Sequence, residues 1–387
     1  MPLDNLQELA HERLCTRCRG RIFASVGHSY TNIQRGEFIE FSLKSFGYEP
    51  STIPENECEI CGGLFSQLQN YSEEIVHRLE GYEFNTFLVG TTLSRDILEK
   101  ETGIQTRYGG KGESLKKEVN RELGKIISLR TGKEFDNADP DIMVKIDVNY
   151  MSIDLQIKSL FVYGVYRKFR RDVPQTRWIK YSEIKDTVES IIGEEAMKIA
   201  GGTNYFLHGA GREDVDVRML GNGREFVIEV AQPKIRGIEL DVLEERINSS
   251  GKGVEVKDLA LVKKPEIVRI KDERYVKKYR ALLENTEGGP VDVARLKSAI
   301  GKLNGKVIYQ RTPLRVSTSR SDLVRQRMIK DVFLESEDPP VIIIEAEAGT
   351  YIKELVSGDG GRTKPSLSDL AGQRIQIREL DVIEIER

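Results

Sequence analysis

The chain lacks several features that define common protein classes. No apolar run in its 387 residues approaches the length of a membrane-spanning helix. The N-terminus, Met1-Pro2-Leu3-Asp4, has no basic and then apolar region of the kind that directs secretion. Neither a Gly-x-Gly-x-x-Gly pattern nor a Walker loop is present, so a nucleotide cofactor is not indicated. These absences predict a cytoplasmic protein without a membrane segment.

An excess of one charge is also missing. The formal net charge is -3, which argues against a uniformly basic nucleic-acid binder. Two segments are nevertheless strongly basic. Residues 161–180 contain six basic residues and one acidic residue, and residues 302–330 contain eight basic residues and one acidic residue. Tyr163, Tyr166 and Trp178 interleave the first segment, as stacking on bases would require. Both segments predict polyanion-binding surfaces, and the alternative is a basic, solvated helix face.

Cysteine is scarce, and it occurs only as two Cys-x-x-Cys pairs. The four residues are Cys15, Cys18, Cys58 and Cys61. Two such pairs supply the four thiolates of a tetrahedral Zn²⁺ site. Disulfides are the alternative, but a reducing compartment favours zinc. Four protein ligands leave no open position, so we expect a structural zinc ion.

Hydrophobic periodicity predicts a small α/β domain in the first half of the chain. Apolar residues at intervals of four predict a helix over residues 113–130. Alternating runs predict a strand pair over 142–148 and 153–157, joined by a strand at 87–89. This domain is expected to end near Phe161.

The second half has the mixed pattern of an α+β domain. The basic aromatic segment 166–178 is expected to be a linker or the first edge of this domain, and a helix follows over 182–200. Other predicted strands cover 224–230, 341–346 and 375–385, and other predicted helices cover 240–247 and 291–300. The length allows two or three domains.

The segment from Gly209 to Gly221 concentrates three carboxylates and two arginines between glycines. A carboxylate beside arginines stays ionised away from water, so an aspartate here is a candidate nucleophile. Asn222-Gly223 is a turn signal that leads into the strand at 224–230, and it places the loop at a sheet edge. The alternative is a solvated, charged turn.

Three segments of the second half share their order and character with the core motifs of a known enzyme class. They begin at Gly211-Arg212-Glu213-Asp214, at Lys278-Tyr279-Arg280 and at Gly349-Thr350-Tyr351-Ile352-Lys353. Together they resemble the motifs of pseudouridine synthases. With the cysteine pairs ahead, the whole chain resembles the archaeal and eukaryotic family that makes pseudouridine at positions 54 and 55 in the TΨC arm of tRNA.

The resemblance implies an α+β fold in three parts. Residues 1–66 would form a zinc-bound module, residues 67–165 a THUMP-like α/β domain that binds RNA, and residues 166–387 the catalytic domain. The catalytic domain would have a mixed, mainly antiparallel sheet flanked by helices. The expected partner is tRNA, the chain is expected to be a monomer, and beyond structural zinc no cofactor is implied. Which of the two positions is modified stays open.

The resemblance also implies roles for single residues. Asp214 matches the catalytic aspartate that attacks the uridine nucleoside. Arg212 matches the arginine that displaces or replaces the flipped base, Tyr279 the tyrosine that stacks on uracil, and Lys353 the basic partner of the aspartate. Tyr351 is an expected substrate contact.

Leu355 is expected to wall the same pocket. A uridine in a folded arm must leave its stack before chemistry, and an aromatic platform offsets part of that cost. Each residue alone has an ordinary alternative, such as a core tyrosine or a surface lysine. Two other functions stay open, a non-catalytic RNA-binding protein and a metal-dependent nuclease that uses Glu213, Asp214 and Asp216.

Overall fold

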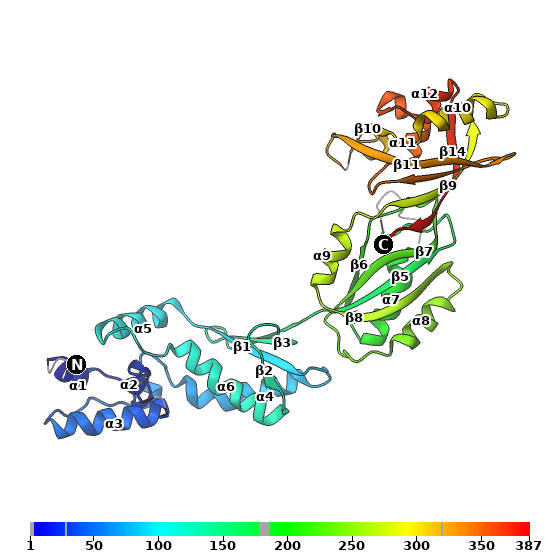
Figure 1. Ribbon diagram of the computed structural model, residues 1–387. Helices are drawn as coiled ribbons and strands as arrows, with labels where there is room; N and C mark the ends of the chain where they lie inside the picture. The colour runs from blue at the N-terminus through cyan, green and yellow to red at the C-terminus, as the bar shows by residue number, and fades with distance from the viewer. Residues whose placement is uncertain (1–3, 28, 178–185, 319) are drawn as a thin grey trace. The chain divides into compact units, whose positions relative to one another are not determined.

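The computed structural model describes residues 4–27, 29–177, 186–318 and 320–387. The chain forms two compact units, and the division falls between Lys158 and Ser159 (Figure 1). Strand β5 (Leu160–Lys168) therefore lies within the second unit, whereas the expected boundary at 165/166 cuts it. The separation of residues 1–66 from 67–165 stays a prediction.

The first unit joins a helical N-terminal part to a four-stranded sheet (Figure 1). Its elements are α1 (Asp4–His11), α2 (Thr16–Ile22), α3 (Asn32–Ser45), η1 (Glu55–Glu57), η2 (Leu64–Gln67), α4 (Leu68–Leu79), β1 (Thr86–Thr92), α5 (Arg95–Arg107), α6 (Leu115–Thr131), β2 (Glu134–Phe135), β3 (Ile142–Asp147) and β4 (Ser152–Ile157). The strand order is β2-β1-β3-β4, and the β3–β4 pair is antiparallel. One apolar core extends from Leu9 to Ile153.

Helix α6 shows how the sequence builds this unit. The hydroxyl of Ser114 accepts the N–H of Lys117 at the N-terminus, and Gly132 ends the helix in the left-handed region at φ 68°. Leu115, Val119 and Leu123 are fully buried, because their spacing of four puts them on one face. The predicted helix and the predicted strand pair are both confirmed.

The second unit is a large mixed sheet with helices packed on it (Figure 1). The strand order is β13-β10-β11-β12-β9-β14-β7-β5-β8, and β6 also pairs with β7. The strands are β5, β6 (Asn204–Gly209), β7 (Val217–Ala231), β8 (Val254–Val262), β9 (Lys277–Asn285), β10 (Val307–Arg311), β11 (Val324–Glu337), β12 (Pro340–Ala346), β13 (Thr363–Lys364) and β14 (Ile375–Ile385). The helices are α7 (Val188–Ala200), α8 (Leu240–Asn248), α9 (Pro265–Asp272), α10 (Val293–Leu303), η4 (Leu314–Val316), α11 (Ile352–Ser357), η5 (Asp359–Gly361) and α12 (Leu367–Ala371).

The mixed, mainly antiparallel sheet expected for this unit is confirmed. Within the described chain, β14 and β7 form its one parallel pair. Helix α7 packs on β7, and α11 packs on β14. The predicted α7 helix begins at Val188, where Thr187 and Ser190 form a capping box, and residues 182–185 lie outside the described residues.

Strand β7 differs from the sequence expectation at two points. The predicted turn at Asn222-Gly223 does not form, because β7 continues from Val217 to Ala231. Its start pairs with β14, and its later part pairs with β5, so the preceding loop leads into an interior strand and not into an edge strand. Gly221 (φ 58°) allows this course, since an added Cβ would lie 1.8 Å from the carbonyl oxygen of Ile383.

The segment after Phe161 also differs from its predicted linker role. Strand β5 is an interior strand between β7 and β8, so the basic aromatic segment begins inside the sheet. The described helices include none that is both long enough and apolar enough for a membrane span.

Candidate active site and metal site

A cavity of about 780 Å³ opens in the second unit around the loop of residues 210–216. We call it the Asp214 pocket, and its volume lies in the usual range for ligand sites. It is also lined by residues of β9, η4, α11 and β14. Five of the six residues implied by the resemblance line it, namely Arg212, Asp214, Tyr279, Tyr351 and Lys353.

Leu355 lies elsewhere. Its side chain is fully buried in the apolar core of the second unit, and it does not line the Asp214 pocket. The apolar lining comes instead from other residues, namely Pro174, Val215, Val217, Val316, Ile352, Leu380 and Val382. These residues have no chemical signal in the sequence, because apolar residues look alike whether they face a core or a ligand.

Asp214 is held between two cations. Nη1 of Arg315 donates to its carboxylate at 2.9 Å, and Nζ of Lys353 lies 3.3 Å from its Oδ2. The side chain is 37% exposed, so it remains open to a ligand in the pocket. The expected lysine partner is therefore present, and the arginine is an addition that the sequence did not predict.

Lys353 has a second and closer carboxylate partner. Its Nζ donates to both oxygens of Asp216, at 2.8 and 2.7 Å. Burial alone would raise the pKa of Asp216, but these hydrogen bonds leave it below its ordinary value. Lys353 thus lies between the two aspartates of the loop.

Arg315 connects the loop to a third segment. Its Nε donates to the buried carboxylate of Glu354 at 2.6 Å, while its Nη1 binds Asp214. The predicted basic segment 302–330 contains it, but composition does not show which cation of such a segment enters a pocket.

Strand β9 contributes two side chains of one face to the pocket, Lys277 and Tyr279. Tyr279 is 9% exposed, and burial raises its pKa to about 12, so its phenol is neutral. Lys278 points to the opposite face and donates to Glu384 at 2.8 Å. The period of two along a strand could have identified Lys277 as a pocket residue.

Tyr351 is fixed at the N-terminus of α11. Its backbone N–H donates to Oε1 of Gln310, and its carbonyl accepts Nε2 of the same side chain, both at 2.9 Å. Its hydroxyl accepts Nη1 of Arg320 at 2.9 Å. The ring is thereby placed at the pocket by a buried glutamine.

A buried ionic network supports the loop from below the pocket surface. Glu213 accepts the hydroxyl of Tyr166 at 2.8 Å and forms an ion pair with Nε of Arg224 at 2.9 Å. Lys168, which is fully buried, donates to the backbone carbonyl of Asp214 at 3.2 Å. These contacts fix the backbone on both sides of Asp214.

The loop acids are therefore bound to cations and not gathered around a metal position. Glu213 faces Arg224, while Asp214 and Asp216 face Lys353. Among the residues that the structure describes, these three acids do not form a cluster of metal ligands. This arrangement gives no support to the nuclease alternative.

Cations in the described part of the first basic segment have carboxylate partners. Arg167 binds Glu255 at 2.6 Å, and Arg171 binds Glu379 at 2.9 Å. Tyr166 is fully buried because β5 is an interior strand, so it offers no stacking face. Trp178 lies outside the described residues. Polyanion binding by this segment stays a prediction, and within the described residues Tyr166 is excluded as a stacking residue.

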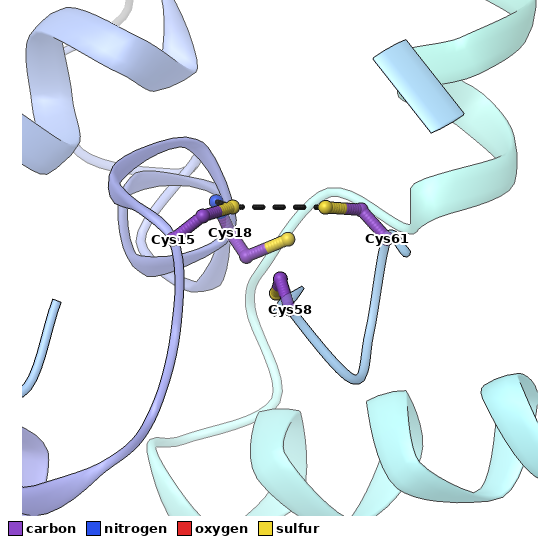
Figure 2. Close-up of side chains that lie close together, drawn as sticks. All are labelled: Cys15, Cys18, Cys58 and Cys61. Atoms are coloured by element: carbon purple, nitrogen blue, oxygen red, sulfur yellow. Dashed lines mark hydrogen bonds between the residues drawn. The ribbon is translucent and has the colours of Figure 1, made fainter. Parts of the chain in front are cut away.

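The four cysteines meet in the first unit (Figure 2). Their sulfur atoms all lie within 4.8 Å of one another, all four side chains are buried, and none forms a disulfide. Sγ of Cys15 and Sγ of Cys61 are 3.7 Å apart. A tetrahedral zinc site with Zn–S bonds of about 2.3 Å has sulfur atoms roughly 3.8 Å apart, so the spacing fits this ion.

The local backbone places the four thiols close together. Cys15 caps the N-terminus of α2, and its sulfur accepts the N–H of Cys18 at 3.4 Å. Gly63 follows the second pair in the left-handed region at φ 74° and lets the chain turn there. The group can hold a metal ion.

Comparison with protein families finds two matches. The model described as "Pus10, C-terminal" matches residues 161–386, and the model described as "Pus10 THUMP domain, archaeal" matches residues 71–147.

Comparison with curated proteins finds relatives over the whole chain. The chain is 49% identical to the "tRNA pseudouridine synthase Pus10" of Thermoplasma acidophilum, over 99% of this chain and 98% of the relative. The protein of the same description from Picrophilus torridus is 46% identical over 99% of each chain, and that from Pyrococcus furiosus is 39% identical over 100% and 98%. Among solved structures, a "Cbf5-Nop10-Gar1 Complex" chain shares 16% identity with a TM-score of 0.30, and the match covers 50% of this chain and 44% of that chain.

Proposed function

The chain belongs to the Pus10 family of tRNA pseudouridine synthases, and on this premise we propose that it isomerises uridine in the TΨC arm of tRNA, with Asp214 as nucleophile. As a pseudouridine synthase it is an isomerase. The modified nucleotide is at position 54, position 55 or both. The observation that carries the assignment of Asp214 is its place in a pocket beside Arg315 and Lys353.

The proposed reaction needs a nucleophile, charge balance and a stacking face. Asp214 attacks the uridine nucleoside, the bond between ribose and N1 breaks, the base rotates, and C5 joins the ribose. Asp214 is then released, C5 loses its proton, and N1 takes one up. The cations Arg315 and Lys353 balance the charge of the carboxylate and hold it in one orientation. No other group has to enter for the atoms to balance.

The flipped base requires a platform and a replacement in the stack. Tyr279 is buried with its neutral ring at the pocket, and it would stack on the uracil. Arg212 lines the same pocket, next to Asp214 in the loop, and it would occupy the space that the base leaves. Tyr351 would contact the bound nucleotide.

Label release tests this function directly. The purified full chain is incubated with an unmodified tRNA transcript that carries tritium at uridine C5, and tritium in water is measured. We expect release by the unaltered protein and none by Asp214→Asn, which keeps the shape of the side chain but removes its charge. Binding of tRNA without any release by the unaltered protein would contradict the function and leave a non-catalytic RNA-binding protein.

Transcripts in which the uridine at position 54, at position 55 or at both is replaced test which position is modified. If both positions are modified, replacement of either uridine removes part of the label release, and replacement of both removes all of it. If one position is used, only its replacement matters. Release that survives both replacements would contradict the TΨC arm as the site.

The remaining parts of the chain also have proposed roles. The match to the archaeal THUMP model over residues 71–147 supports a tRNA-binding domain in this part of the chain, and we propose that it ends before β5. The cysteine spacing supports one structural Zn²⁺ held by Cys15, Cys18, Cys58 and Cys61. We also propose that the protein acts as a monomer, and we place it in the cytoplasm with its tRNA substrate.

A further inference from the structure

Lys277 lines the Asp214 pocket, but the steps of the reaction described so far give it no role. It lies two positions before Tyr279 on the same face of β9, and both line the Asp214 pocket. Residues two apart on a strand are roughly 7 Å apart along it, about the width of a nucleobase. A uracil stacked on Tyr279 would therefore have one ring edge near the amine of Lys277.

The amine lies against the backbone of the loop that carries Asp214. A Cβ added at Gly211 would come within 3.2 Å of Nζ of Lys277 and 2.9 Å of Nη1 of Arg224. Gly211 has φ 90°, a conformation that side chains rarely adopt. The absence of a side chain at Gly211 thus gives the amine room beside the loop.

The surroundings of Lys277 favour its neutral form. Burial first, and then the positive charge of Arg224, lower the pKa of Lys277 to about 7, while Glu213 acts in the opposite direction. From the neighbouring strands, Ala346 and Ile385 stand opposite it in register, and neither titrates. The structure gives the amine no hydrogen bond or ion pair with a described residue, and Arg224 already pairs with Glu213.

The reaction requires a base at this stage. When C5 has joined the ribose, it carries both the sugar and its original hydrogen. Loss of that hydrogen as a proton leaves the electron pair in the C5–C6 double bond, the pair of the N1–C6 double bond moves to N1, and N1 takes up a proton. One proton leaves and one is gained, so no oxidant or co-reactant is needed.

The other titratable groups that line the described part of the pocket are poor candidates for this step. Arginines do not release their protons, and the phenol of Tyr279 is neutral. Asp216 accepts hydrogen bonds from Lys353, Asp214 forms an ion pair with it, and carboxylates are weak bases near neutral pH. The other titratable groups of the lining also have partners, since Glu213 pairs with Arg224, Lys353 pairs with the two aspartates, and the hydroxyl of Tyr351 accepts from Arg320. A neutral amine is the stronger base, and efficient proton transfer favours a group that titrates near the working pH.

We propose that Lys277 is the base that removes the proton from C5 of the rotated uracil and then releases it to solvent. The inference rests on the proposed function and adds a catalytic residue to it. It assigns separate tasks to the two sides of the pocket, where Asp214 acts on the nucleoside and Lys277 acts on the base.

Three variants separate this role from others. Lys277→Met removes the amine and keeps the length of the side chain, whereas Lys277→Arg keeps the positive charge but cannot become neutral. Lys278→Met is the matched control, since Lys278 is the neighbouring lysine on the opposite face of β9. Single-turnover label release is measured with enzyme in excess over tRNA, together with tRNA binding by each variant.

We expect Lys277→Met and Lys277→Arg both to slow release by about a hundredfold or more, with tRNA binding unchanged, and Lys278→Met to retain the rate. Deuterium at C5 should slow the reaction further in Lys277→Met, because proton removal becomes limiting. The rate of the unaltered protein should rise with pH through about 7 as the amine of Lys277 loses its proton, and this rise should be absent from Lys277→Met.

Restoration of the rate by Lys277→Arg would overturn the proposal, since it would show that Lys277 acts as a charge. A rate within threefold of the unaltered protein in Lys277→Met would overturn it as well. Both outcomes presuppose release by the unaltered protein. Failure of that release would instead overturn the proposed function, so the two failures are distinguishable.

Discussion

Nη1 of Arg315 lies 2.9 Å from each carboxylate oxygen of Asp214, although 101 residues separate the two in the sequence. The same guanidinium binds Glu354 through Nε at 2.6 Å. Arg315 therefore joins the 210–216 loop to α11, which also supplies Lys353. The orientation of the proposed nucleophile depends on a residue outside the three motifs that identify the family.

Arg315→Ala should slow catalysis with little change in tRNA affinity. Hydrogen bonds to charged groups contribute about 1.5–3 kcal/mol, and both side chains of this pair are 37% exposed, which favours the lower end. We expect the single-turnover rate to fall about tenfold, since 1.4 kcal/mol corresponds to a factor of about ten. Arg311→Ala is the control, because Arg311 pairs with the exposed Asp322 on the same segment. Equal loss in both variants would contradict the role of Arg315.

The regular elements of this fold follow from local patterns, and the pocket does not. Leu115, Val119 and Leu123 recur at intervals of four, so they define α6 without knowledge of any other segment. The sequence motifs predict that Asp214 and Lys353 belong to the site. Arg315 is different, because nothing in a basic segment shows which of its cations turns inward.

Long-range pairing also overrides local signals. The Asn222-Gly223 turn signal fails because β7 pairs with β14 and β5, and the close approach of Gly221 to Ile383 fixes the strand there. Lys168 looks like part of a basic surface in the sequence, yet it is buried and donates to three backbone carbonyls. Such outcomes depend on strand neighbours that are distant in the chain.

Glu213→Gln should destabilise the second unit strongly. The carboxylate forms a buried ion pair with Arg224, and loss of its charge would leave that guanidinium buried without a counter-charge. Breaking a buried pair costs about 3–5 kcal/mol. Calorimetry of the full chain measures the effect, and Glu255→Gln is the control, since its partly exposed pair with Arg167 should contribute less than about 1 kcal/mol. Equal shifts in the two variants would contradict a structural role for the network.

Metal removal should act on the first unit. Elemental analysis of the full chain should find one zinc ion per molecule, and Cys18→Ser should lose it. Because the thiolates of Cys15 and Cys18 come from α2 and those of Cys58 and Cys61 from a distant segment, loss of the ion removes a link within one apolar core. We expect a chelator to lower the melting temperature of the protein and the variant to be insensitive to it. A chelator-resistant melting temperature in the zinc-loaded protein would contradict a structural ion.

Lys277→Met should make the protein more stable at neutral and acidic pH. The pKa of Lys277 is lowered by burial to about 7 in the folded chain, whereas an unfolded lysine titrates near about 10.4. Between these values the unfolded chain binds more protons than the folded chain, so the stability of the unaltered protein rises with pH in this window and the penalty for the buried charge is largest below it. The stabilisation by Lys277→Met should therefore be greatest below pH 7 and fade towards about pH 10. Melting temperatures across this range test the prediction. Lys278→Met is the control, because the ammonium of Lys278 pairs with Glu384 outside the pocket in the unaltered protein. A constant difference between Lys277→Met and the unaltered protein at every pH would show that packing, and not the titration of the amine, separates them.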